Sequence, residues 1–344
     1  MRKFQIGALF IVLALTSNAQ KKELLVTGDL QYSLPKTNIS VQLEIERIHT
    51  KPGIYYQYSE RYLASNQAIT IENVEFRLRA VQLVPFTVAD PARTFRITPQ
   101  KRSALNYLQL NNKGILCGVN THPINQIEKI IEHNKPQRAC AIQAPAILPL
   151  GEEFMMAGSV AKLAEGAAKQ IYRIRDSRLS ILTGDLEHLP ADGASVKIML
   201  DGLDKAEQEL TALFMGTTEV EVKNVSIVLP IDSLTNEQLA FRLSAFKGLV
   251  DRNDLSGRPY YLKVTKLSGN NANKNEIAQP NTLYTVSPIL CEVAITDGVK
   301  NSATIKTEIP QLGELMPLSP VLLAEPNIKI SIDPTSGRLV SVSK

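Results

Sequence analysis

Three arginines followed by a short polar turn are the residues whose types and spacing depart most from ordinary patterning in this chain. The arginines are Arg173, Arg175 and Arg178, and the turn contains Thr183, Gly184 and Asp185. A guanidinium group offers a planar fork of donors that matches a carboxylate or a phosphate. The chemistry to expect of this cluster is therefore anion pairing, either within the protein or with a partner.

Two interpretations of the arginine cluster follow. Arg178 falls in the apolar row of a predicted helix, where a charge is costly unless it meets a carboxylate. In the structural interpretation, which we favour, Arg178 or Arg175 pairs with Asp185 or with the next helix, and Gly184 allows the turn. In the functional interpretation, the arginines present their fork to an anionic partner, such as a carboxylate or a phosphate-bearing glycolipid.

Motifs for catalysis or metal binding are missing from the sequence. The four histidines, His49, His122, His133 and His188, lack metal-ligand spacing, and the Gly-x-Ser-x-Gly, His-Glu-x-x-His and phosphate-loop patterns do not occur. A stretch with Asp251 resembles a calcium loop, but no Glu closes it. The sequence therefore predicts no catalytic residue, no metal site and no cofactor.

The three cysteines gain a role if the chain is exported. Cys117 and Cys140 are separated by a loop-like stretch and could form a disulfide in an oxidising compartment. Cys291 lies in the apolar run 288–295, where a small core residue is the simplest role. The other two pairings remain open, because spacing alone does not decide connectivity.

The N-terminus has the pattern of a secretory signal peptide. Arg2 and Lys3 precede an apolar run at residues 6–15, and small residues, Ser17 and Ala19, stand before the expected cut. The run is too short to span a bilayer, and no later segment approaches the roughly 20 apolar residues that a membrane helix needs. We expect a soluble, exported mature chain that starts at Gln20 and has no transmembrane segment.

Composition supports a folded protein that does not bind nucleic acid. Hydrophobic residues make up 44% of the 344 residues, as in ordinary globular proteins. The formal net charge is +4, and removal of Arg2 and Lys3 with the leader lowers it to +2. Because basic and acidic residues are this evenly balanced, the chain does not have the basic surface of a nucleic-acid binder.

Two amphipathic helices are predicted in the middle of the chain. Ser159 caps the first, and the second begins after Asp192 and ends at Gly216, with apolar or small residues at alternating steps of three and four in both. The short connector between them predicts an antiparallel hairpin. Each seam is only about three heptads long, so we expect the hairpin to pack also on a sheet.

Strand patterns flank this hairpin on both sides. Residues 39–45 and 74–84 alternate apolar with polar side chains, with a bulge expected near Val81. Tyrosines at helical spacing in residues 52–63 predict a short helix that covers a sheet face. Seven further strands, which suggest a β-sandwich, are expected at residues 220–229, 239–246, 260–267, 289–295, 303–309, 328–332 and 339–342.

The predicted class is thus α+β, with a β-rich N-terminal domain, an antiparallel helical hairpin and a C-terminal β-sandwich-like domain. The expected division is a signal peptide at 1–19, the β-rich domain at 20–117, a connector at 118–158, the hairpin at 159–216 and the sandwich at 217–344.

The mature chain resembles, over nearly all its length, a family of exported Bacteroidota proteins grouped as a domain of unknown function. The resemblance rests on Tyr32, Ser33, Leu34, Pro35, Lys36 and Thr37; on Ile174, Arg175, Arg178, Leu182, Thr183, Gly184 and Asp185; on Leu213, Phe214 and Gly216; and on Asp333, Pro334, Thr335 and Gly337. It implies a periplasmic or cell-surface setting in a Gram-negative envelope. No established activity comes with it.

That setting also implies a modification. Such bacteria O-glycosylate exported proteins at Asp, then Ser or Thr, then an aliphatic residue, and Asp232, Ser233 and Leu234 look like this motif. An ordinary turn between two strands explains the same residues equally well.

The most economical function is a non-enzymatic scaffold or interaction protein in the periplasm, at the periplasmic face of the outer membrane or at the cell surface, with an envelope protein or a glycan as partner. The alternative is a hydrolase or a carbohydrate-binding module whose site is assembled between domains. A cleft with two acidic side chains at hydrolase separation would favour that alternative.

Overall fold

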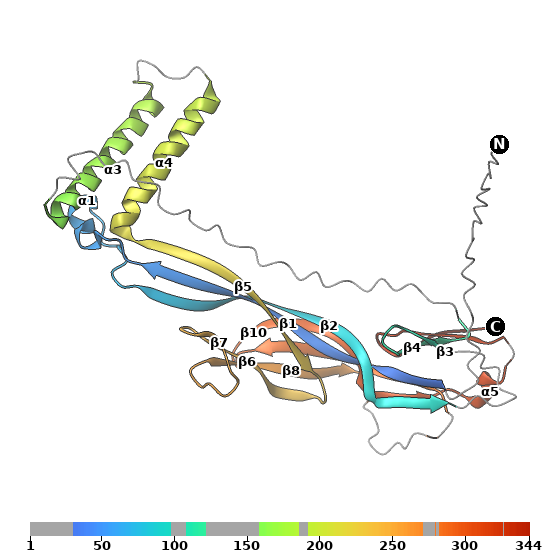
Figure 1. Ribbon diagram of the computed structural model, residues 1–344. Coiled ribbons are helices and arrows are strands. Elements are labelled where there is room, and N and C mark those ends of the chain that lie inside the picture. Colours follow the sequence, from blue (N-terminus) through green and yellow to red (C-terminus); the bar gives the residue numbers. More distant parts are fainter. Residues whose placement is uncertain are drawn as a thin grey trace, which may run out of the picture.

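The computed structural model describes residues 30–97, 108–121, 158–185, 192–270, 279, 282–325 and 327–344. This part of the chain is an elongated body of antiparallel sheets with a helical arm at one end (Figure 1). The predicted β-rich class and the predicted helical hairpin are therefore confirmed.

The strands of the described residues form three sheets. The first, in the order β2-β1-β5, contains β1 (Leu30–Lys51), β2 (Asn73–Ile97) and β5 (Thr217–Pro230). The second, in the order β10-β9-β8-β6-β7, contains β6 (Thr235–Ser244), β7 (Gly248–Val250), β8 (Arg258–Ser268), β9 (Tyr284–Thr296) and β10 (Asn301–Pro317). The third, in the order β12-β11-β4-β3, contains β3 (Leu108–Leu110), β4 (Leu116–Val119), β11 (Lys329–Ile332) and β12 (Leu339–Ser343).

The part of the chain that the structure describes has few helices, and most of them are short. They are the 3-10 helix η1 (Tyr56–Tyr58), α1 (Ser59–Leu63), α3 (Val160–Thr183), α4 (Gly193–Met215) and α5 (Pro320–Leu323). None of the helices in the described ranges is long and apolar enough to cross a membrane.

The central core lies between the three-stranded and five-stranded sheets. Alternate residues of β1, from Ile39 to Ile45, are buried there against apolar side chains of β8, β9 and β10. This is the period-two pattern expected from the sequence. β5 pairs with β1 without a register shift from Asn38↔Pro230 to Lys51↔Thr217. Residues from both sides of the helical hairpin thus share one sheet and one core.

The predicted C-terminal sandwich is not confirmed as a unit of its own. The seven strands expected after the hairpin are all present, but β5 belongs to the sheet of β1, and β11 and β12 join β3 and β4 in the third sheet. The bulge expected near Val81 lies close by, since the register between β1 and β2 shifts where Arg79 is inserted between Leu78 and Ala80.

The helical arm has the ends predicted from its sequence. The Ser159 side chain accepts a hydrogen bond from the Lys162 amide at the start of α3, and that of Asp192 accepts one from the Ser195 amide at the start of α4. Gly184 ends α3 in the left-handed conformation, with φ of 79°.

The arm packs on a short helical segment rather than on a sheet face. Tyr55, which precedes η1, is buried with Phe214 of α4 and Ile171 of α3, and the ring centroids of Tyr55 and Phe214 are 5.5 Å apart. The helix expected at residues 52–63 is therefore present, but the prediction that it covers a sheet was wrong. The apolar side chains of this short helix cover the apolar side chains of α3 and α4 at the end of the hairpin nearest the sheets.

A stalk of three strands connects the arm to the central core. We define it as residues 46–51 of β1, 73–77 of β2 and 217–223 of β5, which lie beyond most of the apolar cluster (Figure 1). Ion pairs replace apolar contacts here. They join Arg47 to Glu221 and Lys51 to Glu219, both at 3.5 Å, and Arg77 to Glu75 at 2.8 Å. A hydrogen bond of 2.7 Å also links the His49 ring to the carboxyl group of Glu72.

Candidate functional site

The arginine cluster lies on the arm and pairs with the second helix. Arg175 Nε is 2.7 Å from Glu207 Oε1, and Arg178 Nη2 contacts the other carboxylate oxygen of the same residue. Arg178 Nε also lies 3.2 Å from Asp204 Oδ1. Arg175 and Arg178 of α3 therefore converge on one carboxylate of α4, and Glu207 is the better shielded member, with its side chain 16% exposed.

Asp185 is engaged elsewhere. Its carboxylate accepts a hydrogen bond of 2.6 Å from the hydroxyl of Thr183, and its amide donates to the carbonyl of Ser180. Of the two pairing partners considered from the sequence, the second helix is thus the one used. The residues Thr183, Gly184 and Asp185 form the end of α3 instead of extending the arginine fork.

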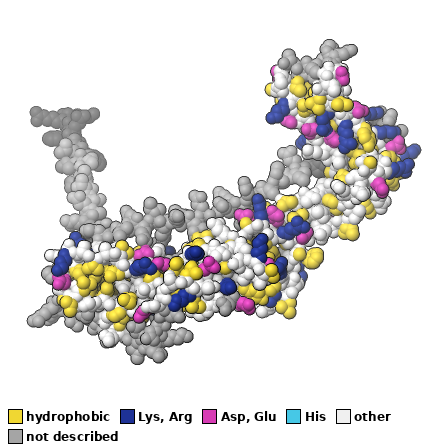
Figure 2. Space-filling model, turned by 180° about the vertical axis from the view of Figure 1, so that it is seen from behind, with side chains coloured by type: hydrophobic (Ala, Val, Ile, Leu, Met, Phe, Trp, Pro, Cys, Tyr) yellow, Lys and Arg dark blue, Asp and Glu magenta, His cyan; other side chains and the backbone are white. Residues whose placement is uncertain are grey.

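The distal half of the arm carries a shallow apolar groove. Its volume is about 610 Å³, and its walls come from both helices, including Ile181 of α3 and Ile198, Met199 and Leu203 of α4. Two of these lining side chains, Ile198 and Met199, are 71% and 41% exposed. Figure 2 shows hydrophobic side chains gathered towards the end of the arm, beyond a band of charged ones.

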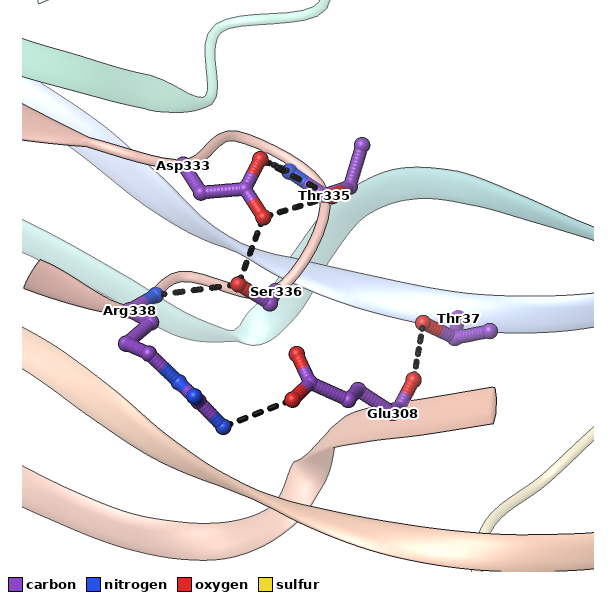
Figure 3. Close-up of polar contacts among 6 residues, drawn as sticks. All are labelled: Thr37, Glu308, Asp333, Thr335, Ser336 and Arg338. Atoms are coloured by element: carbon purple, nitrogen blue, oxygen red, sulfur yellow. Dashed lines mark hydrogen bonds and ion pairs between the residues drawn. The ribbon is translucent and has the colours of Figure 1, made fainter. Parts of the chain in front are cut away.

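A second polar cluster sits at the turn between β11 and β12, as Figure 3 shows. Asp333 accepts hydrogen bonds from the amide and hydroxyl of Thr335 and, at 2.7 Å, from the hydroxyl of Ser336. Arg338 pairs with Glu308 of β10 at 2.6 Å, and the carbonyl of Glu308 accepts a hydrogen bond from Thr37 (Figure 3). The cluster ties the last two strands to β10 and β1.

The cleft beside this turn has a volume of about 410 Å³. Thr335, Ser336, Lys306 and Glu308 are among its lining residues. The Ser336 hydroxyl donates to the carboxylate of Asp333, which also accepts hydrogen bonds from Thr335 of the same turn. No histidine is among the residues that line the cleft. A serine needs a base that can take its proton, so this arrangement does not activate Ser336 as a nucleophile.

Three clefts lined by described residues each contain a single acidic side chain. These are Glu325 near the C-terminus, Asp176 on the arm and Glu308 beside the β11–β12 turn. Glycoside hydrolysis needs two carboxyl groups that face one bond. None of these three clefts meets that requirement. Within the described ranges, no group of three His, Cys, Asp or Glu residues is placed to hold a metal ion.

The calcium-like stretch is a turn satisfied by the protein itself. Asp254 accepts a hydrogen bond of 2.9 Å from the Ser256 amide and lies 3.1 Å from the ammonium of Lys247. Hydrogen bonds from Ser256, together with Lys247, lower the pKa of Asp254 to about 2. Asp251 caps the same loop by accepting from the Asn253 amide. The carboxylates thus have partners without a cation.

The cysteines have different surroundings. Cys291 is fully buried in the central core, as its apolar strand indicated. Cys117 is half-buried in β4, and its thiol donates to the carbonyl of Ile115. Burial raises the pKa of both thiols, so neither is a ready thiolate at neutral pH. Cys140 lies outside the described residues, so the pairing with Cys117 stays a prediction. His122, His133 and His188 lie outside them too.

The predicted glycosylation motif lies on the turn between β5 and β6. Ser233 is exposed there, and its neighbour Asp232 pairs with Lys36 at 2.7 Å. The turn interpretation accounts for these contacts, and modification of Ser233 stays a prediction.

Sequence reasoning missed two pairs. Glu207 lies next to the apolar row of α4, and its proximity to Arg178 depends on how the helices are rotated against each other. The hydroxyl of Tyr32 accepts a buried hydrogen bond of 2.8 Å from the amide of Tyr284. A buried tyrosine needs such a partner, but no local signal identifies one 252 residues away.

Comparison with known proteins gives a family without an assigned activity. No curated protein and no solved structure matches this chain. The sequence model of one family matches residues 29–340, which is nearly all of the chain after the predicted leader. The resemblance to a family of unknown function is thereby confirmed, and the chain belongs to the family described as Domain of unknown function (DUF4831).

Proposed function

We propose that this protein is a non-enzymatic interaction protein of the cell envelope, and that its helical arm binds a protein partner. The observation that carries the proposal is the apolar groove at the distal half of the arm, whose lining residues Ile198 and Met199 are 71% and 41% exposed. Apolar side chains clustered on one surface are typical of interaction sites, because their exposure to water is costly.

The geometry of the arm suits this role. The groove lies at the end of the arm that is remote from the sheets (Figure 1). The ion pairs of Arg175 and Arg178 with Glu207 brace the helices below it. A braced hairpin presents a surface with little ordering cost on binding. We expect the partner to supply an apolar face of its own, such as one side of an amphipathic helix.

Export supports the envelope setting in this proposal. The leader pattern at residues 1–19 is the basis for it. N-terminal sequencing of protein from the periplasmic fraction should begin at Gln20. Intact protein recovered from the cytosol, with Met1 or Arg2 at its start, would contradict export.

Site-specific photocrosslinking in cells tests the docking surface. A photoreactive residue at Ile198 and one at Met199, both of which line the groove, should give the same adduct, whereas one at Val299, a turn residue that is 90% exposed, should not. The identified partner is then purified, and its affinity for the parent and for Ile198→Glu is measured. We expect Ile198→Glu to weaken binding by about tenfold or more, because it places a charge in an apolar contact.

Two results would contradict the proposal. One is an adduct that forms equally well from Val299. The other is unchanged affinity of Ile198→Glu for the partner. Circular dichroism of each variant shows whether the arm remains folded, so that lost binding is not mistaken for unfolding.

A further inference from the structure

The outer edge of β5 is a regular strand edge, whereas the opposite edge of the same sheet, formed by β2, is irregular. β5 pairs with β1 over its whole length without a bulge, and in the described part of the chain no strand pairs with its other side. β2, on the opposite edge, is interrupted by two register shifts, and its Phe76 amide donates to the carbonyl of Ala245. Bulges and covering contacts protect an edge from added strands, and a regular strand invites them.

The exposed half of β5 lies in the stalk. Val220 is 42% exposed, and the surrounding residues from Thr218 to Glu221 are exposed as well. This segment extends beyond the apolar cluster of the central core, which begins on β5 at Val225. A strand in this position can accept a partner strand beside it without disturbing that core.

The charges on this edge select one way of pairing two copies. Glu219, Glu221 and Lys223 lie on one face of β5, opposite His49, Arg47 and Ile45 of β1. In an antiparallel pair related by a twofold axis perpendicular to the sheet, opposed residues lie on the same face. With the axis at Val222, each Glu221 is opposite Lys223 of the other copy. An axis at Glu221 would set each Glu219 opposite Lys223 but place the two Glu221 side chains against each other, and an axis at Lys223 would oppose the two lysines. Only the axis at Val222 forms the attractive pairs without a like-charge pair.

We propose that two copies of this chain pair antiparallel along the outer edges of β5, about a twofold axis at Val222. Residues 217–227 of each copy then form the junction of one continuous six-stranded sheet. The interface is isologous, so each favourable contact occurs twice. The two arms, which directly precede β5, then lie on opposite sides of the twofold axis.

A charge exchange in the mature full-length chain tests the proposal. The parent should form a dimer in analytical ultracentrifugation. Glu221→Lys and Lys223→Glu should each weaken the dimer by about tenfold or more, because two attractive pairs become two repulsive pairs. The double variant, with both substitutions, should restore the dimer, since the pairs are again opposite in sign. Glu219→Lys is the matched control, because Glu219 is opposite Val225 in this register.

Cysteine crosslinking tests the register directly. In a dimer with its axis at Val222, a cysteine in place of Val222 faces its own copy, so Val222→Cys should give a covalent dimer on mild oxidation. Val220→Cys should not, since residue 220 then faces Asn224. The parent chain is oxidised in parallel to account for Cys117, Cys140 and Cys291.

Three results would overturn the proposal. The first is a parent chain that remains monomeric at every concentration measured. The second is a dimer that neither Glu221→Lys nor Lys223→Glu weakens. The third is crosslinking from Val220→Cys that equals crosslinking from Val222→Cys. Thermal unfolding of each variant distinguishes loss of the interface from loss of the fold.

Discussion

Arg178 of α3 and Glu207 of α4 form an ion pair that joins the two helices of the arm, and Arg175 adds a hydrogen bond of 2.7 Å to the same carboxylate. One acidic residue thus serves two basic residues of the facing helix. Because Glu207 is well shielded and the guanidinium of Arg178 is only one-third exposed, the contact holds the helices in register as well as balancing charge.

Replacement of Arg178 by alanine should destabilise the protein. We expect a loss of about 1 kcal/mol in the free energy of unfolding, since the pair is partly screened by water but leaves Glu207 with fewer donors when broken. Urea denaturation measures this loss. Arg173→Ala is the control, because Arg173 forms no ion pair with the described residues. Unchanged stability combined with lost partner binding would favour the interpretation that the arginines bind an anion.

Replacement of Tyr32 by phenylalanine should leave a buried amide without its acceptor. The Tyr284 amide donates to the Tyr32 hydroxyl at 2.8 Å, and burial raises the pKa of this phenol well above its usual range. An unsatisfied buried donor costs about 1–3 kcal/mol, so the free energy of unfolding should fall by that amount. Tyr284→Phe removes a hydroxyl whose partner among the described residues is the Gln279 amide, and it should cost less. Equal stability of Tyr32→Phe and the parent would show that the amide finds another partner.

Replacement of Gly53 by alanine should loosen the base of the arm. A Cβ atom at Gly53 would overlap the backbone carbonyl of Leu213 in α4, and the adjacent Tyr55 amide donates to that same carbonyl at 2.7 Å. The substitution should lower the melting temperature. Gly202→Ala, in the open middle of α4, is the matched comparison and should stabilise by about 0.5–1 kcal/mol through helix propensity. A Gly53→Ala protein that melts with the parent would show that the contact is not tight in solution.

The stabilising contribution of the Asp254 carboxylate should decrease at acidic pH. Its pKa is lowered to about 2 in the folded protein, by Ser256 first and Lys247 as well, from an ordinary value of 3.8. A carboxyl group with a lowered pKa adds stability above its unfolded pKa, and this contribution is lost as the pH falls towards the folded pKa. The difference in melting temperature between the parent and Asp254→Asn should therefore be constant from pH 7 to about pH 5 and shrink from about pH 4 to pH 2. A difference that does not change with pH over this range would contradict the assignment.

Local signals correctly predicted the two long helices, the short helix at residues 52–63 and most of the strands. Ser159 and Asp192 are N-caps whose chemistry acts within one turn, and Gly184 and Gly216 end the helices for equally local reasons. The alternation from Ile39 to Ile45 needs only a sheet with one buried face. Such features depend on neighbours within a few residues, so they can be read from the sequence.

Pairings between distant residues could not be predicted in the same way. The tyrosines at residues 55–62 indicated a short helix, but not that it would pack on the arm. The pairing of β5 with β1 joins segments on either side of α3 and α4. The alternation of apolar and polar residues indicates a strand, but it does not indicate which other strand will pair with it. The contact of Arg178 with Glu207 likewise depends on the relative rotation of two helices.

The pairing of β1 with β5 also sets an order of events during synthesis. β1 lies between β2 and β5, so its edge that faces β5 has no native neighbour until residues 217–230 have emerged. The loop that this contact closes contains the whole arm, so the contact is costly in chain entropy and is expected to form late. A nascent chain would meanwhile expose the apolar face of β1, which is the kind of segment that chaperones retain.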